Sequence, residues 1–286
     1  EWSDWYPLFQ AGRDKRIPRN PGLYRIRSKG SKTLEYLGQT GRSLRGRLGQ
    51  LSGIYKEIMP YNDPHTAGPA LWALRKETKA EYEASVCVLD DFSTPERKGA
   101  ECLAIYQHRK SYGKSPSFNF GRMPLGYSKS SNNTVKLARE GKRHRGTRTD
   151  ELFPNHFPSL DFDNTIELLW EKDELGLYGW SSWVPVDNSP LAGKKDKGLY
   201  MLKNSETCEI LYIGEGKISD RVANHLNKAK IKDHPQRHIF GSIDKIQCSF
   251  IVKSEFAKNQ RLEFENDLIG ALINFSGRVP LGQFIG

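Results

Sequence analysis

Two parts of the chain carry the same kinds of polar residue in the same order. A guanidinium can clamp a phosphate through two parallel N–H bonds, and carboxylate oxygens suit a hard divalent cation. Together with tyrosine hydroxyls, these groups suit phosphodiester hydrolysis, which needs an activated water and stabilisation of negative charge on phosphorus. The first set is Tyr24, Tyr36, Arg47, Glu101 and Asn119, and the second is Tyr200, Tyr212, Arg221, Glu265 and Gln283.

An internal duplication explains why the set occurs twice. The tripeptide Gly-Leu-Tyr at 22–24 returns at 198–200, and Tyr-Leu-Gly at 36–38 returns as Tyr-Ile-Gly at 212–214, both 176 residues later. The opening Trp-Ser-x-Trp-x-Pro at 2–7 returns at 180–185. Repeats of this kind predict two copies of one domain. We interpret the tryptophan-rich lead-in as structural, with its aromatic rings packed at the edge of a sheet.

Each copy resembles a GIY-YIG nuclease domain. The resemblance rests on the two tripeptides and on the Arg, Glu and Asn that follow them. The resemblance implies that Tyr24 is the general base and that Tyr36 lies beside it on the neighbouring strand. It implies that Arg47 clamps the scissile phosphate, that Glu101 holds Mg²⁺ or Mn²⁺, and that Asn119 orients the site by hydrogen bonding. Arg45 competes with Arg47 for the phosphate, and the flanking leucines favour Arg47.

The second copy departs from this pattern. His225 follows Arg221 by one helical turn, Glu265 takes the metal position, and Gln283 replaces the asparagine. The extra methylene of Gln283 is expected to disturb the hydrogen bond. Two interpretations stay open: a second active nuclease, or a degenerate copy that positions DNA or mediates dimerisation. The degenerate copy is the preferred interpretation. With a single active site, one chain is expected to nick one strand of the DNA. His65 and His108 are isolated in the sequence and are interpreted as surface histidines.

The elements that must position these residues form an α+β unit. The apolar and β-branched segments 23–27 and 34–38, with a Gly/Ser/Lys turn between them, predict a β-hairpin. Leucines spaced at helical intervals predict a helix within 41–51, residues 82–90 predict a third strand, and 93–111 predict a capped helix. We therefore expect two copies of a small antiparallel sheet flanked by helices, at 1–121 and 180–286, with a basic linker and connector at 122–179.

The positive charge is concentrated in the first half of the chain. Residues 1–150 carry 28 Lys and Arg against 15 Asp and Glu, and residues 151–286 carry 16 against 19. Within 122–149, eight basic residues face one acid, which is typical of an exposed, phosphate-tracking arm. The sequence thus predicts nucleic-acid binding, with six candidate contacts: Arg42, Arg45, Lys142, Arg143, Arg145 and Arg148.

The resemblance and the charge together predict a metal-dependent endonuclease acting on double-stranded DNA. With no separate recognition motif in the sequence, a restriction-type enzyme is favoured. The alternatives are a repair or junction-cleaving nuclease and a catalytically silent nucleic-acid-binding protein. The four cysteines lack a metal-binding spacing and predict reduced thiols. The expected location is the cytoplasm, without membrane attachment, and the expected partner besides DNA is a second chain meeting it on the target.

Overall fold

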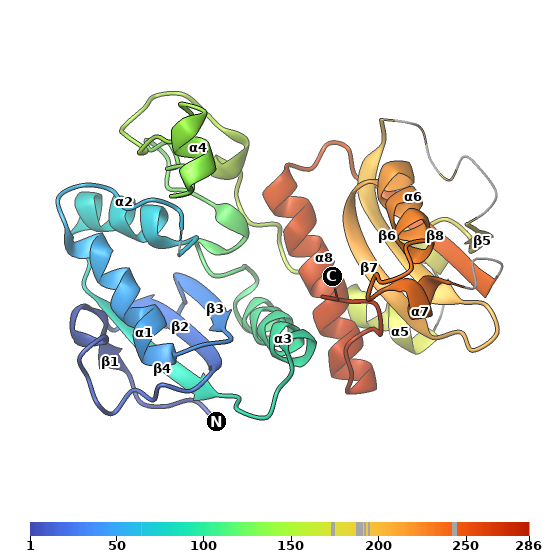
Figure 1. Ribbon diagram of the computed structural model, residues 1–286, viewed down its shortest axis with the longest axis horizontal. Coiled ribbons are helices and arrows are strands. Elements are labelled where there is room, and N and C mark those ends of the chain that lie inside the picture. The colour runs from blue at the N-terminus through green and yellow to red at the C-terminus, as the bar shows by residue number, and fades with distance from the viewer. Residues whose placement is uncertain are drawn as a thin grey trace. The chain divides into compact units, whose positions relative to one another are not determined.

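The computed structural model describes residues 1–63, 65–172, 175–186, 191, 193, 195–241 and 245–285. These residues form an α+β fold with two four-stranded antiparallel sheets (Figure 1). The chain divides into two compact units. Unit 1 comprises Glu1–Ser93 and Gln107–Asp161, and unit 2 comprises Thr94–Tyr106 and Phe162–Gly286. The expected linker at 122–149 therefore belongs to unit 1, and the expected first copy shares one helix with unit 2.

The sheet of unit 1 has the strand order β1-β4-β2-β3. Its strands are β1 (Tyr6–Pro7), β2 (Gly22–Ser28), β3 (Tyr36–Thr40) and β4 (Tyr82–Val88). Helices α1 (Leu44–Gln50) and α2 (Gly68–Thr78) and the 3₁₀ helix η2 (Leu51–Tyr55) pack with this sheet, around a core that includes Tyr24, Leu44 and Leu48. The short helix α4 (Val135–Arg139) lies in the basic segment.

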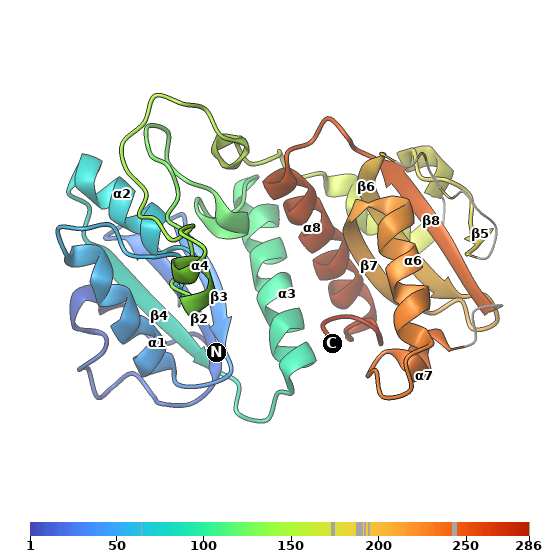
Figure 2. The ribbon, with the colours of Figure 1, turned by 45° about the horizontal axis from the view of Figure 1, so that its top comes forward.

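The sheet of unit 2 repeats this order as β5-β8-β6-β7. Its strands are β5 (Val184–Pro185), β6 (Lys197–Asn204), β7 (Ile210–Lys217) and β8 (Ile246–Val252), and its helices after α5 (Leu168–Lys172) are α6 (Ile218–Ala229), α7 (Arg237–Phe240) and α8 (Lys258–Ser276). Alternate residues of a strand point to opposite faces of the sheet. Leu199 and Met201 accordingly pack in the core that contains α8, whereas Tyr200 and Leu202 pack in the core that contains α6 and α7 (Figure 2).

Helix α3 (Thr94–Tyr112) begins in unit 2, where it packs against α8. Asn266 Nδ2 of α8 donates a hydrogen bond to the Cys102 carbonyl of α3 at 3.2 Å. A Cβ atom at Gly270 would lie 2.3 Å from the Cβ of Tyr106, so the two backbones approach closely there. Cys102 and Tyr106 are the counterparts of Asn266 and Gly270 in the duplication, so equivalent helices meet through equivalent positions.

The lead-in has the same structural role in both copies. Ser3 Oγ accepts a hydrogen bond from the backbone N–H of Val86 at 3.0 Å, and Ser181 Oγ accepts one from Phe250 at 3.0 Å. The neighbouring serine of the same strand, Ser85 or Ser249, donates back to the carbonyl of the lead-in serine at 2.8 and 2.7 Å. The lead-in serine therefore ties the chain to β4 or β8.

The tryptophans of the lead-in stack against basic side chains of the central strand. The guanidinium of Arg27 lies 4.0 Å from the ring centre of Trp5, and the ammonium of Lys203 lies 4.3 Å from that of Trp183. These contacts are cation–π interactions within each unit. The tryptophan-rich repeat is thus a packing motif.

Among the described helices, none combines the length and the apolar character needed to cross a membrane.

Candidate functional site

The paired tyrosines of unit 1 lie side by side on one face of the sheet. Tyr24 of β2 is paired with Gly38 of β3, and the ring centres of Tyr24 and Tyr36 are 6.1 Å apart. A Cβ atom at Gly38 would lie 2.7 Å from the Tyr24 hydroxyl oxygen and 2.6 Å from the Tyr36 ring. Only glycine leaves room for both rings at this point.

Unit 2 repeats this arrangement. Tyr200 is paired with Gly214, and the ring centres of Tyr200 and Tyr212 are 6.0 Å apart. A Cβ atom at Gly214 would lie 2.5 Å from the Tyr200 hydroxyl oxygen and 2.7 Å from the Tyr212 ring. The third residue of the second tripeptide is therefore a glycine for the same steric reason in both copies.

A buried histidine contacts the tyrosine pair in each unit. The Tyr24 hydroxyl is 2.9 Å from His65 Nε2, and the Tyr200 hydroxyl is 3.0 Å from His225 Nε2. His65 is 5% exposed and His225 is 4% exposed. Burial, followed by the nearby arginine, lowers the pKa of His65 to about 3 and that of His225 to about 4. Both imidazoles are therefore uncharged at neutral pH.

The interpretation of His65 and His108 as surface residues is wrong, because both side chains are buried. His65 was missed because it comes from a different element than its counterpart. His225 lies on α6, one turn after Arg221, whereas His65 lies in the loop that precedes α2. The position one turn after Arg47 is Leu51, where α1 has already given way to η2. Because α1 ends at Gln50, no α-helical residue lies four positions after Arg47, and the place of the histidine is taken by a residue from a later loop.

Arg221 reaches the tyrosine pair of unit 2 from the start of α6. Its side chain lies over Gly216, whose φ of +133° is one that only glycine adopts readily. Burial opposes the charge of Arg221, but the hydroxyls of Tyr200 and Tyr212 and the carboxylate of Glu265 outweigh burial and raise its pKa. The guanidinium is therefore held charged next to the two hydroxyls.

In unit 1, the two candidate arginines have different surroundings. Arg45 donates hydrogen bonds to the carbonyls of Ile17 at 2.6 Å and Lys15 at 2.9 Å, so it fixes the loop before β2. Arg47 lies close enough to His65 to lower the pKa of that imidazole. The structure thus places Arg47 with Tyr24, Tyr36 and His65, and it gives Arg45 a structural role.

Glu265 of α8 brings a carboxylate to the unit 2 site. Burial, together with the carboxylate of Glu215, raises the pKa of Glu265 to about 8, although Arg221 opposes the shift. Glu215 is itself paired with Arg261, at 3.1 Å between Oε2 and Nε. Glu263, two residues earlier, is fully buried. Glu265 is therefore a carboxyl group that keeps its proton at neutral pH, and a divalent cation bound there would displace that proton.

The donor set fits a magnesium-like ion that retains water. Within the described ranges, no three His, Cys, Asp or Glu side chains gather as a ready-made metal cage. Mg²⁺ is commonly bound by one or two carboxylates and completes its shell with water and substrate phosphate. Glu265, with Glu215 as its acidic neighbour, would supply the protein ligand.

Glu101, the counterpart of Glu265, lies on the part of α3 that belongs to unit 2. There, burial raises the pKa of Cys102, and the carboxylates of Glu101 and Glu265 add to that shift. Glu101 is thus grouped with Glu265, whereas the other members of the first set, Tyr24, Tyr36, Arg47 and Asn119, all lie in unit 1.

The terminal amides brace the second tripeptide in both copies. Asn119 Oδ1 accepts from the Leu37 N–H at 2.9 Å, and its Nδ2 donates to the Leu37 carbonyl at 2.8 Å. Gln283 Oε1 accepts from the Ile213 N–H at 3.1 Å. Leu37 and Ile213 are equivalent central residues of the tripeptides. The longer amide of Gln283 therefore reaches the same backbone group, contrary to the expected loss of geometry.

The basic segment is docked on unit 1. Met123 and Tyr127 are buried in the unit 1 core, and Arg148 and the Tyr127 hydroxyl both bond to Glu77. Arg145 donates to the Met59 carbonyl. Arg42, Lys142 and Arg143 are exposed. Most of the segment is exposed, and Met123 and Tyr127 anchor it in the unit 1 core.

Comparison with family models, with curated proteins and with solved structures found no match to this chain.

Proposed function

We propose that the protein is a metal-dependent endonuclease that hydrolyses phosphodiester bonds in double-stranded DNA. The observation that carries the proposal is the recurrence, at the same place on two sheets, of a tyrosine pair, a buried uncharged histidine and an adjacent arginine. Packing alone has no need of two hydroxyls, an imidazole and a guanidinium on one sheet face. Their recurrence in both units supports a chemical role.

The side chains of this cluster suit attack of water on phosphorus. Tyr24 and Tyr200 are the candidate proton acceptors from the attacking water. Their hydrogen bonds to His65 and His225 fix the direction of each hydroxyl, so both histidines are positioning residues. Arg47 and Arg221 would bind the scissile phosphate and stabilise the charge that develops on it.

Glu101 and Glu265 are the residues that would hold Mg²⁺ or Mn²⁺. When bound, such an ion stabilises negative charge on the phosphoryl oxygens and favours ionisation of a bound water. The position of Glu265 next to Glu215 and Arg221 supports this assignment in unit 2.

The second copy is proposed to be an active site as well. Tyr200, Tyr212, Arg221 and His225 reproduce the unit 1 cluster, and Gln283 makes the backbone contact that Asn119 makes. The excess of acidic residues in 151–286 is the remaining argument for a degenerate copy. Within the class, a restriction-type role is favoured over repair or junction cleavage, because the sequence carries no separate recognition motif.

The decisive experiment is digestion of supercoiled plasmid with Mg²⁺, with EDTA as the metal-free control. If both sites cut, Arg47→Ala and Arg221→Ala each convert a linearising enzyme into a nickase, and the double variant is inactive. If only the first copy cuts, the wild type nicks and Arg221→Ala does not change the rate. If the protein binds DNA but cleaves no plain, modified or branched DNA, the nuclease proposal fails, and the alternative of a catalytically silent nucleic-acid-binding protein is supported.

A further inference from the structure

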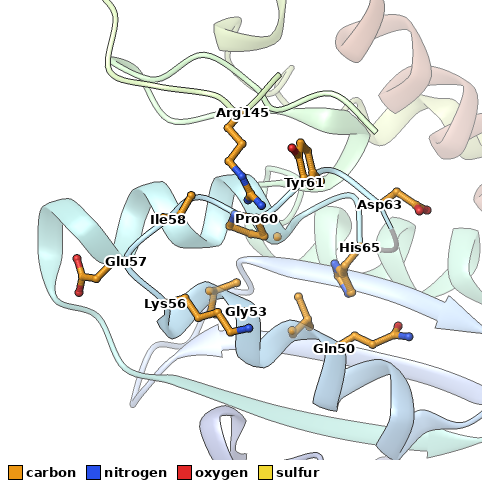
Figure 3. A pocket seen from close by; sticks show the side chains of 13 residues that line it. Gln50, Gly53, Lys56, Glu57, Ile58, Pro60, Tyr61, Asp63, His65 and Arg145 are labelled. Atoms are coloured by element: carbon orange, nitrogen blue, oxygen red, sulfur yellow. The ribbon is translucent and has the colours of Figure 1, made fainter. Parts of the chain in front are cut away.

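Unit 1 contains a pocket of about 380 Å³ next to the tyrosine–histidine cluster. Its lower wall is formed by the end of α1 and by η2, and its upper wall by the loop from Ile58 to Asp63 (Figure 3). Gln50 and His65 lie at one end of the pocket and Glu57 and Ile58 at the other. A volume of this size lies in the range of small-molecule sites.

Apolar side chains line part of the pocket. Leu51, Ile54, Ile58 and Pro60 line the pocket with apolar atoms. Ile58 is 63% exposed, although it is a large apolar residue. Its side chain adds apolar surface beside the pocket.

The rim adds a stacking platform and a cation. Arg145 of the basic segment lies with its guanidinium carbon 4.0 Å from the ring centre of Tyr61, and Figure 3 shows both side chains above the pocket. The hydrogen bond from Arg145 to the Met59 carbonyl holds this arrangement. An aromatic ring and an arginine at one opening are the combination with which proteins stack on nucleobases and follow the attached phosphates.

The inner end of the pocket connects it to the candidate active site. His65 lines the pocket and bonds the Tyr24 hydroxyl through Nε2. Its Nδ1 atom is buried and has no hydrogen-bond partner within the described part of the chain. Gln50, at the same end, lies three residues after Arg47 on α1, which places it about one helical turn away.

We propose that this pocket receives a single nucleobase extruded from the duplex beside the phosphate that unit 1 cleaves. The apolar walls would contact the ring faces, Tyr61 with Arg145 would close the opening, and Gln50 with His65 would meet the polar edge of the base. Extrusion trades base pairing and stacking in the duplex for contacts in a fitted pocket, and it makes the choice of base a source of specificity. The inference rests on the proposed function, because it names the DNA element that the same site recognises.

A pocket-filling variant tests the proposal without straining the backbone. A Cβ atom at Gly53, which lines the pocket, would have the Pro60 Cβ at 3.9 Å as its nearest neighbour. The Cβ atom of Gly53→Leu therefore fits without a clash, and the rest of the leucine would extend into the pocket. The matched control is Gly176→Leu, at an exposed glycine of unit 2 where a Cβ atom would have no neighbour within 4 Å. A second variant, Tyr61→Ala, removes the stacking platform instead of filling the pocket.

The duplex that the wild type binds most tightly in Ca²⁺ is first selected from random sequences. The fluorescent base 2-aminopurine is then placed at successive positions of this duplex, and its fluorescence is measured. Fluorescence of this base rises when it leaves the stack. We expect a change of several-fold at one position, its loss in Gly53→Leu and Tyr61→Ala, and its persistence in Gly176→Leu. Gly53→Leu should bind the intact duplex at least tenfold more weakly than the wild type does. On a duplex that lacks the base at that position, the two proteins should bind equally well. Thermal unfolding shows whether each variant is folded.

The outcomes separate the pocket from the proposed function. Binding and cleavage without a fluorescence change at any position, with Gly53→Leu as active as wild type, would overturn the pocket proposal and leave the nuclease. A pocket-dependent fluorescence change without cleavage would support the pocket and overturn the nuclease. If the protein binds no DNA, both proposals fail.

Discussion

At the residue scale, the charge of Glu265 links stability to pH. Its pKa of about 8 lies far above the usual value of a glutamate. Between pH 5 and 8, the native state therefore keeps a proton that the unfolded state has released. Stability is present below this range and is lost as the pH rises through it.

We predict that Glu265→Gln abolishes this loss, because glutamine does not ionise. In EDTA, the free energy of unfolding of the wild type relative to Glu265→Gln should fall by about 2–4 kcal/mol from pH 5 to pH 8. Urea unfolding at each pH measures the difference. At pH 8, added Mn²⁺ should stabilise the wild type and leave Glu265→Gln unchanged. Parallel pH profiles of the two proteins would contradict the prediction.

His65 shows what sequence reasoning could not reach at this scale. Its tyrosine, Tyr24, is recognisable from the local tripeptide, whereas the histidine comes from a distant loop and matches no position of the second copy. His225 could be found because a helix places it one turn from Arg221. A contact made by a loop depends on the three-dimensional path of the chain, which residue spacing does not encode.

At the scale of elements, the last residue of the second tripeptide, Gly38 or Gly214, leaves the space that the paired tyrosine rings occupy. Gly38→Ala would bring a Cβ atom to within 3 Å of both unit 1 tyrosine rings. We predict that it lowers cleavage by the unit 1 site at least tenfold, because the Tyr24 hydroxyl must move away from His65. The assay is plasmid cleavage in a Glu265→Ala background, so that only unit 1 contributes. Gly176→Ala, where the new methyl meets no neighbour, should behave as wild type. Equal activity of the two glycine variants would show that the tyrosine positions do not matter.

Different residues of the basic segment are predicted to contribute to DNA affinity and to stability. All three side chains are exposed, but Lys142 and Arg143 form hydrogen bonds within the basic segment, whereas Arg148 bonds to Glu77 of α2. The double variant Lys142→Gln/Arg143→Gln should reduce the slope of log affinity against log salt by about 0.9 for each phosphate that the segment no longer neutralises. Arg148→Gln should mainly lower the melting temperature.

The control for the salt dependence is neutralisation of two exposed lysines of unit 2, Lys230→Gln/Lys232→Gln, which should leave the slope unchanged. If both double variants change the slope equally, unit 2 binds DNA as strongly as the basic segment does.

Three strands and two helices of the first copy could be predicted from the sequence, because strands and amphipathic helices are specified by local patterns, whereas β1 and α2 were not predicted. The hairpin of β2 and β3, strand β4 and helices α1 and α3 lie where the patterns indicated. The docking of 122–149 could not be predicted, because it depends on two apolar side chains, Met123 and Tyr127, and on polar contacts such as that of Arg148 with Glu77, which leave no periodic pattern in the sequence. The division of α3 between two units escaped prediction for a related reason. Its surface toward α8 consists of residues such as Gly99 and Cys102, which show little periodic hydrophobicity.

At the scale of the whole molecule, the contact between α3 and α8 tests how tightly the duplicated helices are fitted. Gly270→Ala would place a methyl group 2.3 Å from the Cβ of Tyr106, so the helices must separate. We predict a loss of about 1–3 kcal/mol in the free energy of unfolding. Chemical denaturation measures it, with Gly176→Ala as the reference substitution. A neutral result would mean that the two helices are loosely held.

The same contact has a consequence for how the two halves evolved. Equivalent positions facing each other are what an isologous interface between identical subunits would show. Tyr106 now faces its own counterpart, which is a glycine, so a large residue in one half depends on a small one in the other. Two first halves would bring tyrosine against tyrosine, and two second halves would leave a gap between glycines. The fused chain, with one tyrosine facing one glycine, therefore fits at this contact where neither half would fit a copy of itself.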